Sequence, residues 1–324
     1  MLENTLLLVT VLLVSATIIP FFPSKHWLSR VWEFPRIQIA CLAVFSAILS
    51  INIQSSNLAI ALVIINLLVA IYQAVWILPY TLFFPKQVPS VKGEKAYCSI
   101  KILTSNVLMS NHNADKLINL IAEHQPDIIV TLETDNWWQK ALTPIHPNYP
   151  HRVNQALDNL YGMHLYSKFE LQGVQVRDLI ENNVPSIHCY LVVNESLKIK
   201  CHFLHPAPPS PTENEYSRPR DQELLLIARE VKSKAEPTIV TGDLNDIAWS
   251  PTTRAFRHIS GLKDPRIGRG MYNTFHAKYP FMRWPLDHIF HSDHFELVKL
   301  TRLPSIGSDH FPLLSDLAYI QRKS

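Results

Sequence analysis

Glycine is scarce in this chain, and its scarcity excludes several kinds of site. Only eight of the 324 residues are glycine, and no glycine-rich loop is present. A P-loop and a dinucleotide-binding turn both need closely spaced glycines, because their backbone amides must approach the ligand phosphates closely. The sequence therefore argues against nucleotide sites of both types.

Cysteine is also rare. The four cysteines, Cys41, Cys98, Cys189 and Cys201, form no CxxC pair and no spacing typical of a zinc site. Cys189 and Cys201 lie on two runs that we expect to pair as strands across a short turn, where they face each other. In the cytoplasm both remain thiols.

Charge is missing from three long apolar runs near the N-terminus. Residues 6–22, 37–53 and 58–78 contain no Asp, Glu, Lys or Arg, and each approaches the roughly 20 residues that cross a bilayer as a helix. A signal peptide is the rival interpretation of the first run, but no basic segment precedes it. Buried helices of a soluble core are a weaker rival. We predict three transmembrane helices in a membrane anchor at 1–85, a linker at 86–97 and a further domain at 98–324.

Basic residues in the short loops predict the orientation of this anchor. They follow the first and third runs: Lys25, Arg30, Arg36, Lys86, Lys92 and Lys95. The start of the chain and the link between the second and third runs contain none. We therefore expect an integral protein of the cell (inner) membrane with a cytoplasmic second domain, and the opposite orientation is the alternative. Asn66 and Gln73, seven residues apart in the third run, are interpreted as helix–helix hydrogen-bonding groups.

Net charge is absent from the rest of the chain. Residues 1–96 contain six of the 30 Lys and Arg and three of the 27 Asp and Glu, which leaves 24 of each sign in residues 97–324. The formal charge of +3 therefore belongs to the N-terminal region. Such a balance is mild evidence against a duplex-binding protein, because contacts to phosphates supply most of the affinity for nucleic acid.

Apolar periodicity predicts a mixture of strands and helices beyond the linker. Helices are expected after Asn113, which acts as the cap, at 221–234, and after Ser250-Pro251. Residues 187–193 and 197–204 form a probable hairpin. The other strands are expected at 99–107, 127–132, 163–167, 171–176, 286–290, 295–303 and 311–319.

The most informative stretch is 238–250, TIVTGDLNDIAWS. A β-branched run reads as a buried strand, and Gly242 breaks it directly before Asp243, Asn245 and Asp246. Carboxylates and a carboxamide at the end of a buried strand are unfavourable unless they bind something. An Asp/Asn-rich turn is the plain alternative.

Other strand ends have the same pattern. Polar groups follow or precede apolar runs at Asn106, Glu133, His205, Asp287-His288 and Asp309-His310. Oxygen ligands such as Glu133, Asp309 and Asn106 suit Mg²⁺ or Mn²⁺. A carboxylate such as Asp243 can orient or deprotonate water, and a carboxylate beside a histidine fixes the imidazole tautomer. Together these groups point to hydrolysis of a phosphate ester.

Residues from about 98 to 319 resemble the endonuclease/exonuclease/phosphatase superfamily. The carrying motifs are SNV, the strand-end LE, YSKFEL, the LHP stretch, GDLND, LDHIF and GSDH. The resemblance implies an α/β fold, a four-layer αββα sandwich of two mainly antiparallel sheets. It also implies a metal-dependent phosphoric ester hydrolase.

The resemblance also implies roles for individual residues. Glu133 binds Mg²⁺ or Mn²⁺, and Asn106 and Asp309 help to bind metal or phosphate. Asp243 aligns the attacking water, and Asn245 holds a phosphate oxygen. The catalytic histidines are His310, which pairs with Asp287, and His205. No role is implied for His288.

Three functions are compatible with these features of the sequence. The first is a membrane-tethered phosphoesterase acting on a phosphate ester, with a lipid phosphate, pyrophosphate or phosphodiester favoured because the bilayer is then the partner. The second is a membrane-anchored nuclease of DNA or RNA, which the balanced charge disfavours. The third is a non-catalytic membrane scaffold, which we disfavour because every expected position is filled.

Overall fold

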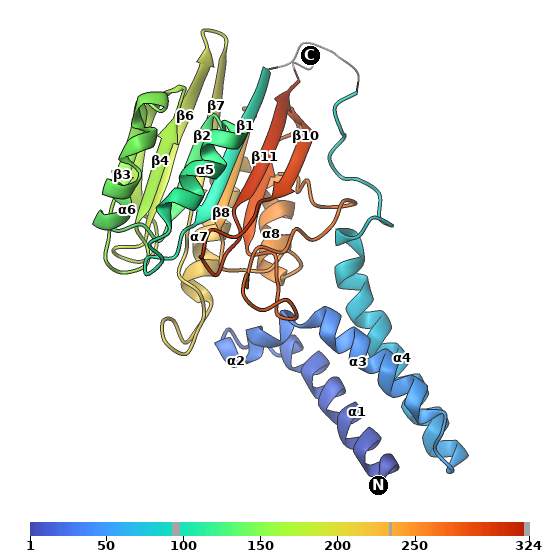
Figure 1. The fold of residues 1–324 in the computed structure, drawn as a ribbon. Coiled ribbons are helices and arrows are strands. Elements are labelled where there is room, and N and C mark those ends of the chain that lie inside the picture. The colour runs from blue at the N-terminus through green and yellow to red at the C-terminus, as the bar shows by residue number, and fades with distance from the viewer. Residues whose placement is uncertain (93–97, 233–234, 321–324) are drawn as a thin grey trace. The chain divides into compact units, whose positions relative to one another are not determined.

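The computed structural model of the chain describes residues 1–92, 98–232 and 235–320 (Figure 1). Two compact units are formed: Met1–Pro85 with Pro209–Ser217, and Lys86–Pro208 with Arg218–Ser324. Of the predicted linker, residues 93–97 lie outside the described part of the chain, as does the end of the helix expected to finish at residue 234.

The first unit is helical. Its helices are α1 (Leu2–Ile18), α2 (Trp27–Arg30), α3 (Arg36–Ser50) and α4 (Ser56–Ile77), with 3-10 turns at Ile19–Phe21, Val31–Glu33 and Leu78–Tyr80. By length and composition, Leu2–Phe21 and Ser56–Tyr80 are apolar enough to cross a membrane. The middle segment differs from the expectation. Helix α3 has 15 residues, a length of about 22 Å, and a bend of 66° separates it from Trp27–Glu33. A third span is present only if this bent pair crosses as one.

Side-chain amides join the long helices. Asn66 donates to Thr10 Oγ1 over 2.8 Å, and Gln73 donates to Thr17 Oγ1 over 2.9 Å. Both amides are buried, so the interpretation of Asn66 and Gln73 as helix–helix hydrogen-bonding groups is confirmed.

A segment from far along the sequence completes this first unit. Residues Pro209–Ser217 belong to it, and His26 and Tyr216 form an antiparallel bridge. Trp27 N–H donates to the Glu215 carbonyl over 2.9 Å, and Ser217 N–H donates to the Lys25 carbonyl over 2.8 Å.

The second unit contains two sheets. The six-stranded sheet has the order β10 (Phe295–Arg302), β11 (Leu313–Tyr319), β1 (Cys98–Asn106), β2 (Ile128–Leu132), β4 (Met163–Ser167) and β3 (His151–Gln155). The five-stranded sheet has the order β5 (Glu170–Asp178), β6 (Pro185–Asn194), β7 (Leu197–Leu204), β8 (Thr238–Asp243) and β9 (Asp287–His291). Only β1/β2 and β7/β8 pair in parallel among these neighbours, so the sheets are mainly antiparallel.

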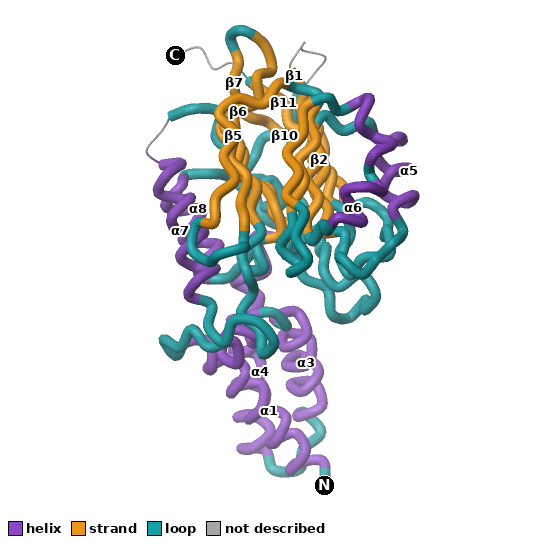
Figure 2. The backbone as a smooth tube through the Cα atoms, turned by 90° about the vertical axis from the view of Figure 1, so that its left-hand side faces the viewer, coloured by secondary structure: helices purple, strands orange, loops and turns teal. Residues whose placement is uncertain are grey.

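Helices cover the outer faces of both sheets (Figure 2). Helices α5 (Ala114–His124) and α6 (Asn136–Ala141) lie on the six-stranded sheet, with a 3-10 turn at Thr143–Asn148; α7 (Arg218–Lys232) and α8 (Pro251–Ser260) lie on the other. The largest apolar cluster lies between the sheets and includes Ile100, Val130 and Phe203. The predicted αββα sandwich is therefore confirmed.

Local signals explain several of these boundaries. Helix α5 buries Leu117 and Ile121 on one face, as their i, i+4 spacing predicts. Helix α8 begins as expected, because the Ser250 hydroxyl accepts from Thr253 N–H over 2.9 Å and Pro251 follows it. In the hairpin, Cys189 and Cys201 are register partners and both are free, buried thiols.

Candidate active site

Strand ends of the six-stranded sheet bring four predicted residues to one edge. Asn106 ends β1, and Glu133 follows the parallel strand β2, so the two lie at the same edge. Strand β11 runs antiparallel to β1. Asp309 and His310, which precede β11, therefore lie at this edge as well.

The five-stranded sheet contributes in the same way. His205 follows β7, and Asp243 ends β8, which is parallel to β7. Strand β9 is antiparallel to β8 and begins at Asp287, the register partner of Asp243. Asn106 of the first sheet donates to Asp243 Oδ2 over 3.2 Å, so the two sets of strand ends meet.

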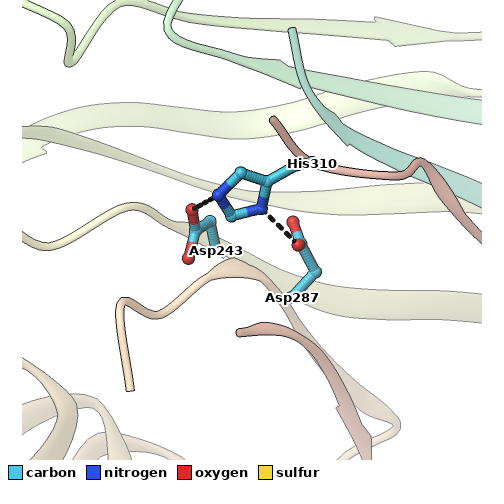
Figure 3. Close-up of side chains that lie close together, drawn as sticks. All are labelled: Asp243, Asp287 and His310. Carbon is cyan, nitrogen blue, oxygen red and sulfur yellow. Dashed lines mark hydrogen bonds and ion pairs between the residues drawn. The ribbon is translucent and has the colours of Figure 1, made fainter. Parts of the chain in front are cut away.

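Three of these side chains form a carboxylate–imidazole–carboxylate chain (Figure 3). His310 Nδ1 lies 2.7 Å from Asp287 Oδ2, and His310 Nε2 lies 3.4 Å from Asp243 Oδ2. All three residues are at least 96 % buried. The predicted pairing of Asp287 with His310 is thus present as a contact.

The two histidines near Asp243 differ in charge. Burial lowers the pKa of His310, but Asp243 and Asp287 outweigh it and raise this pKa to about 10. Burial lowers the pKa of His205 to about 4, although Asp243 partly opposes the shift. His205 Nε2 lies 3.9 Å from Asp243 Oδ2. His310 is therefore an imidazolium at neutral pH, and His205 is neutral.

Strand β8 ends in a turn that only glycine permits. A Cβ on Gly242 would lie 1.9 Å from the Leu204 carbonyl oxygen, and its φ is +151°. Asn245 follows with a φ of +49°, and its N–H donates to Asp243 Oδ1 over 2.9 Å. Asn245 Nδ2 donates to the Pro206 carbonyl over 3.0 Å, which joins this turn to the residue after His205.

The residues that could hold a metal ion lie beside this chain. Asn106 Nδ2 donates to Glu133 Oε1 over 2.7 Å. The pKa of Glu133 is raised to about 7, mainly by burial. The hydrogen bond from Asn106 opposes this shift, whereas the charges of Asp309 and Asp243 contribute to it. Carboxylates that disfavour one another's charge in an all-oxygen donor set are suited to a hard divalent cation. Glu133, Asp309 and Asn106 therefore fit Mg²⁺ or Mn²⁺.

A metal ion could also fit among Asp243, Asp287 and His310, because one ligand atom from each lies within 4.8 Å of the others. The chemistry of the side chains favours a metal ion at Glu133, Asp309 and Asn106 instead. Both ring nitrogens of His310 face carboxylates, and a protonated imidazole has no lone pair for a metal. We therefore treat this trio as a proton-holding chain.

One buried residue at the site was missed in the sequence. Arg220 of α7 donates to the Asn245 carbonyl over 2.7 Å and lies 3.3 Å from Asp246 Oδ1. It thus supports the turn that contains Asn245. His288, for which no role was predicted, lies between the Asp246 carbonyl and Arg266.

The aromatic rings beside the two histidines were also not predicted from the sequence. Phe275 lies 4.9 Å from His310 between ring centroids, and Tyr161 lies 5.4 Å from His205. Both belong to loops outside any recognised motif, so no signal in the sequence would have found them.

Comparison with known proteins identifies related folds. The model of the Endonuclease/Exonuclease/phosphatase family matches residues 103–310. No curated protein matches the sequence.

Three solved structures illustrate the likeness. An endonuclease/exonuclease/phosphatase from Beutenbergia cavernae is 14 % identical, with a TM-score of 0.55 over 68 % of this chain and 72 % of that one. The human Nocturnin catalytic domain is 18 % identical, with a TM-score of 0.55 over 69 % and 96 %. D. rerio TDP2 in complex with a single-stranded DNA product is 15 % identical, with a TM-score of 0.53 over 68 % and 98 %. At these identities the likeness shows the fold.

Proposed function

Because the chain belongs to the endonuclease/exonuclease/phosphatase family, whose members are metal-dependent phosphoric ester hydrolases, we propose that it is a membrane-tethered phosphoesterase whose catalytic machinery is the cluster at Asp243. The observation that carries this proposal is the convergence of six strand ends on one edge of the sandwich. Asn106, Glu133, Asp243, Asp287 and His310 contact one another there through hydrogen bonds or ion pairs.

The geometry supports a division of labour among these residues. The Asp243 carboxylate is held between Asn106, the Asn245 N–H and the two histidines, so it is positioned to orient an attacking water. Charged His310 offsets the negative charge of a phosphate bound beside it, and Asp287 holds the imidazolium ring in place. Glu133, Asp309 and Asn106 would hold a divalent ion, which when bound would neutralise charge on the phosphate and the leaving oxygen.

A lipid-borne substrate is favoured by a loop that leads into the site. Tyr279, Phe281 and Met282 at its tip are 57 %, 87 % and 53 % exposed. The base of the loop is bonded to the site, since Ala277 N–H donates to the Asp309 carbonyl over 2.6 Å. Exposed apolar side chains of this size mark interaction surfaces, and a bilayer is the apolar partner that the anchor already supplies.

A nuclease remains the second candidate. D. rerio TDP2 binds a single-stranded DNA product on the same fold. The balanced charge of residues 97–324 disfavours this function here. A non-catalytic scaffold is less favoured still, because Asn106 contacts Glu133 and Asp243, and His310 contacts Asp243 and Asp287.

The metal is tested by Glu133→Gln in the full chain. We expect at least about a hundredfold loss of phosphoesterase activity, since preorganised charge at such a site is worth several kcal/mol. An unchanged melting temperature would show that the fold survives. Full activity of the wild type in excess chelator would contradict the metal assignment.

The substrate is tested with the full chain in lipid nanodiscs. We expect faster hydrolysis of a lipid phosphate ester or pyrophosphate than of plasmid DNA at equal phosphate concentration. Phe281→Ser should slow the lipid reaction and leave hydrolysis of a soluble ester unchanged, whereas Val176→Ser, which removes an exposed apolar side chain on β5, serves as the matched control. Efficient DNA cleavage with no turnover of any lipid would establish the nuclease instead.

A further inference from the structure

A second polar hollow lies beside helix α8. It has a volume of about 640 Å³ and is lined by Gln87, Arg254, Arg257, His258 and Lys263 together with four small or apolar residues. None of the catalytic or metal-binding residues proposed above is among its lining residues. Its size falls within the range of roughly 300–1,000 Å³ that small-molecule pockets have.

The lining is positively charged. Arg254, Arg257 and Lys263 contribute three formal charges, His258 is a fourth basic group, and no carboxylate is among the lining residues. On α8, Arg254, Arg257 and His258 are spaced i, i+3 and i+4, so they share one face. Lys263 also pairs with Asp293, which is not among the lining residues.

The guanidinium at the centre of this group is held in place. Arg257 Nη2 donates to Gln87 Oε1 over 3.1 Å, and the same oxygen accepts from Asp264 N–H over 2.9 Å. The nearby Asp264 carboxylate is already bound by Arg266 through two hydrogen bonds of 2.9 and 2.8 Å. A preorganised guanidinium binds phosphate with less loss of entropy than a mobile one.

Gln87, which lines this hollow, lies close in the sequence to the last apolar helix. It follows Tyr80, the end of the last apolar helix, by seven residues, a length of chain that spans at most about 25 Å. Lys86, which is exposed, precedes it. If α4 crosses a bilayer, phosphate head groups are therefore within reach of this region of the chain.

We propose that this hollow, which we call the α8 pocket, is a second anion site that binds a phosphate group without hydrolysing it. Arg254, Arg257 and Lys263 are the groups that recognise it. The ligand is the head group of an anionic phospholipid or a soluble phosphate. The lipid alternative rests on the proposed membrane tethering, whereas the binding of phosphate itself does not.

Native mass spectrometry of the detergent-solubilised full chain tests the proposal. Arg254→Ala/Lys263→Ala removes two charges and keeps the Arg257–Gln87 bond. The matched control is Arg229→Ala/Lys232→Ala, two exposed cations on α7. We expect phosphatidylglycerol adducts to fall at least about tenfold in the first variant, since it removes two charge-assisted hydrogen bonds to the phosphate, and to stay within about twofold of wild type in the control.

Two further arms identify the source of the phosphate. Phosphatidylcholine should be retained far less than phosphatidylglycerol, and glycerol 3-phosphate should bind to the same residues if the soluble compound is the ligand. Each arm is repeated with Glu133→Gln, so that a failure of catalysis leaves the binding result intact. Equal retention of the two lipids, with glycerol 3-phosphate bound to the same residues, would assign the soluble compound as the ligand. Binding of phosphatidylglycerol and of glycerol 3-phosphate that is equal in both double variants would overturn the α8 pocket as an anion site.

Discussion

At the scale of single residues, the Asp243 carboxylate is the centre of the site. Its Oδ2 faces a charged imidazole and a neutral one. Burial raises the pKa of Asp243, but His310, His205 and hydrogen bonds from Asn245 and Asn106 outweigh it and keep the pKa below its ordinary value. The site therefore holds an ionised carboxylate and a spare proton on His310 over the same pH range.

Asp287 and His310 should act as one unit in catalysis. Their 2.7 Å contact fixes the orientation of the imidazole and stabilises its charge, so removing either side chain disables the other. We expect Asp287→Asn, His310→Ala and the double variant to lose activity to a similar extent, about 10³-fold, as coupled catalytic residues do. Single-turnover rates of all three would check this, and fully additive losses would mean that the two side chains work separately.

Glu223 predicts a pH dependence of stability. Burial first, and then Glu181 and Asp178, raise its pKa from 4.5 to about 8. The folded state then holds the proton more tightly than the unfolded state. Its contribution is complete below pH 4.5 and is lost as the pH rises to 8.

Glu223→Gln removes this dependence. Relative to wild type, the variant should gain stability between pH 4.5 and 8, by on the order of a few kcal/mol. Thermal melts of both proteins at pH 5 and pH 9 measure the difference, and Glu230→Gln on the same helix is the control. An identical gain at both pH values would be inconsistent with a raised pKa.

The site residues that can be predicted from the sequence are the polar residues at strand ends. Asn106, Glu133, Asp243 and Asp287 are polar groups next to apolar runs, and such a juxtaposition is visible without coordinates. Arg220 is not visible in this way, because a helix surface normally contains arginines. Its function depends on which turn α7 packs against, and this is a tertiary contact.

At the scale of elements, the start of α7 supports the turn after β8. Arg220 is 1 % exposed and contacts Asp221, Asp246 and the Asn245 carbonyl. Removing one partner of a buried ion pair leaves the other charge uncompensated.

We therefore expect Arg220→Met to lower the free energy of unfolding by about 3–5 kcal/mol. Arg218→Met, an exposed change at the same end of α7, should have little effect. Urea denaturation of both variants in detergent would compare them. Equal stability would show that the pair is replaceable by apolar packing.

The elements that sequence reasoning missed are short or polar. Strand β3 (HRVNQ) contains a single aliphatic residue and lies at the edge of its sheet, so it has neither a buried run nor a clear alternation. Helix α6 has six residues, too few for a periodic pattern. By contrast, β4 and β7 have their predicted bounds because both are buried runs.

At the scale of the whole molecule, the segment 209–217 limits the membrane topology. Residues 25–27 are hydrogen-bonded to 215–217, so both must lie on the same side of a bilayer. Between them in the sequence lie α3 and α4. If α4 crosses, α3 must cross as well, despite its length of 15 residues. The pairing of 25–27 with 215–217 therefore favours the three spans that the sequence predicts.

Cysteine labelling tests both span number and orientation. In a chain with Cys41 and Cys98 replaced by Ser, Lys92→Cys should resist an impermeant thiol reagent in intact cells, and Asn4→Cys should react. Both sites should react once the cells are permeabilised. Labelling of the two sites from the same side would mean an even number of spans, and labelling of Lys92→Cys alone would reverse the orientation.

The two parts of the first unit are synthesised at different times. His26 and its partner Glu215 are 189 positions apart, so at about 5–20 residues per second the ribosome needs roughly 10–40 s between them. The helices of the first unit leave the ribosome well before segment 209–217, which completes the unit. A nascent chain in which only one of α3 and α4 crossed a membrane would keep 25–27 and 215–217 on opposite sides of it. Formation of this short bridge late in synthesis therefore requires that both helices cross or that neither does.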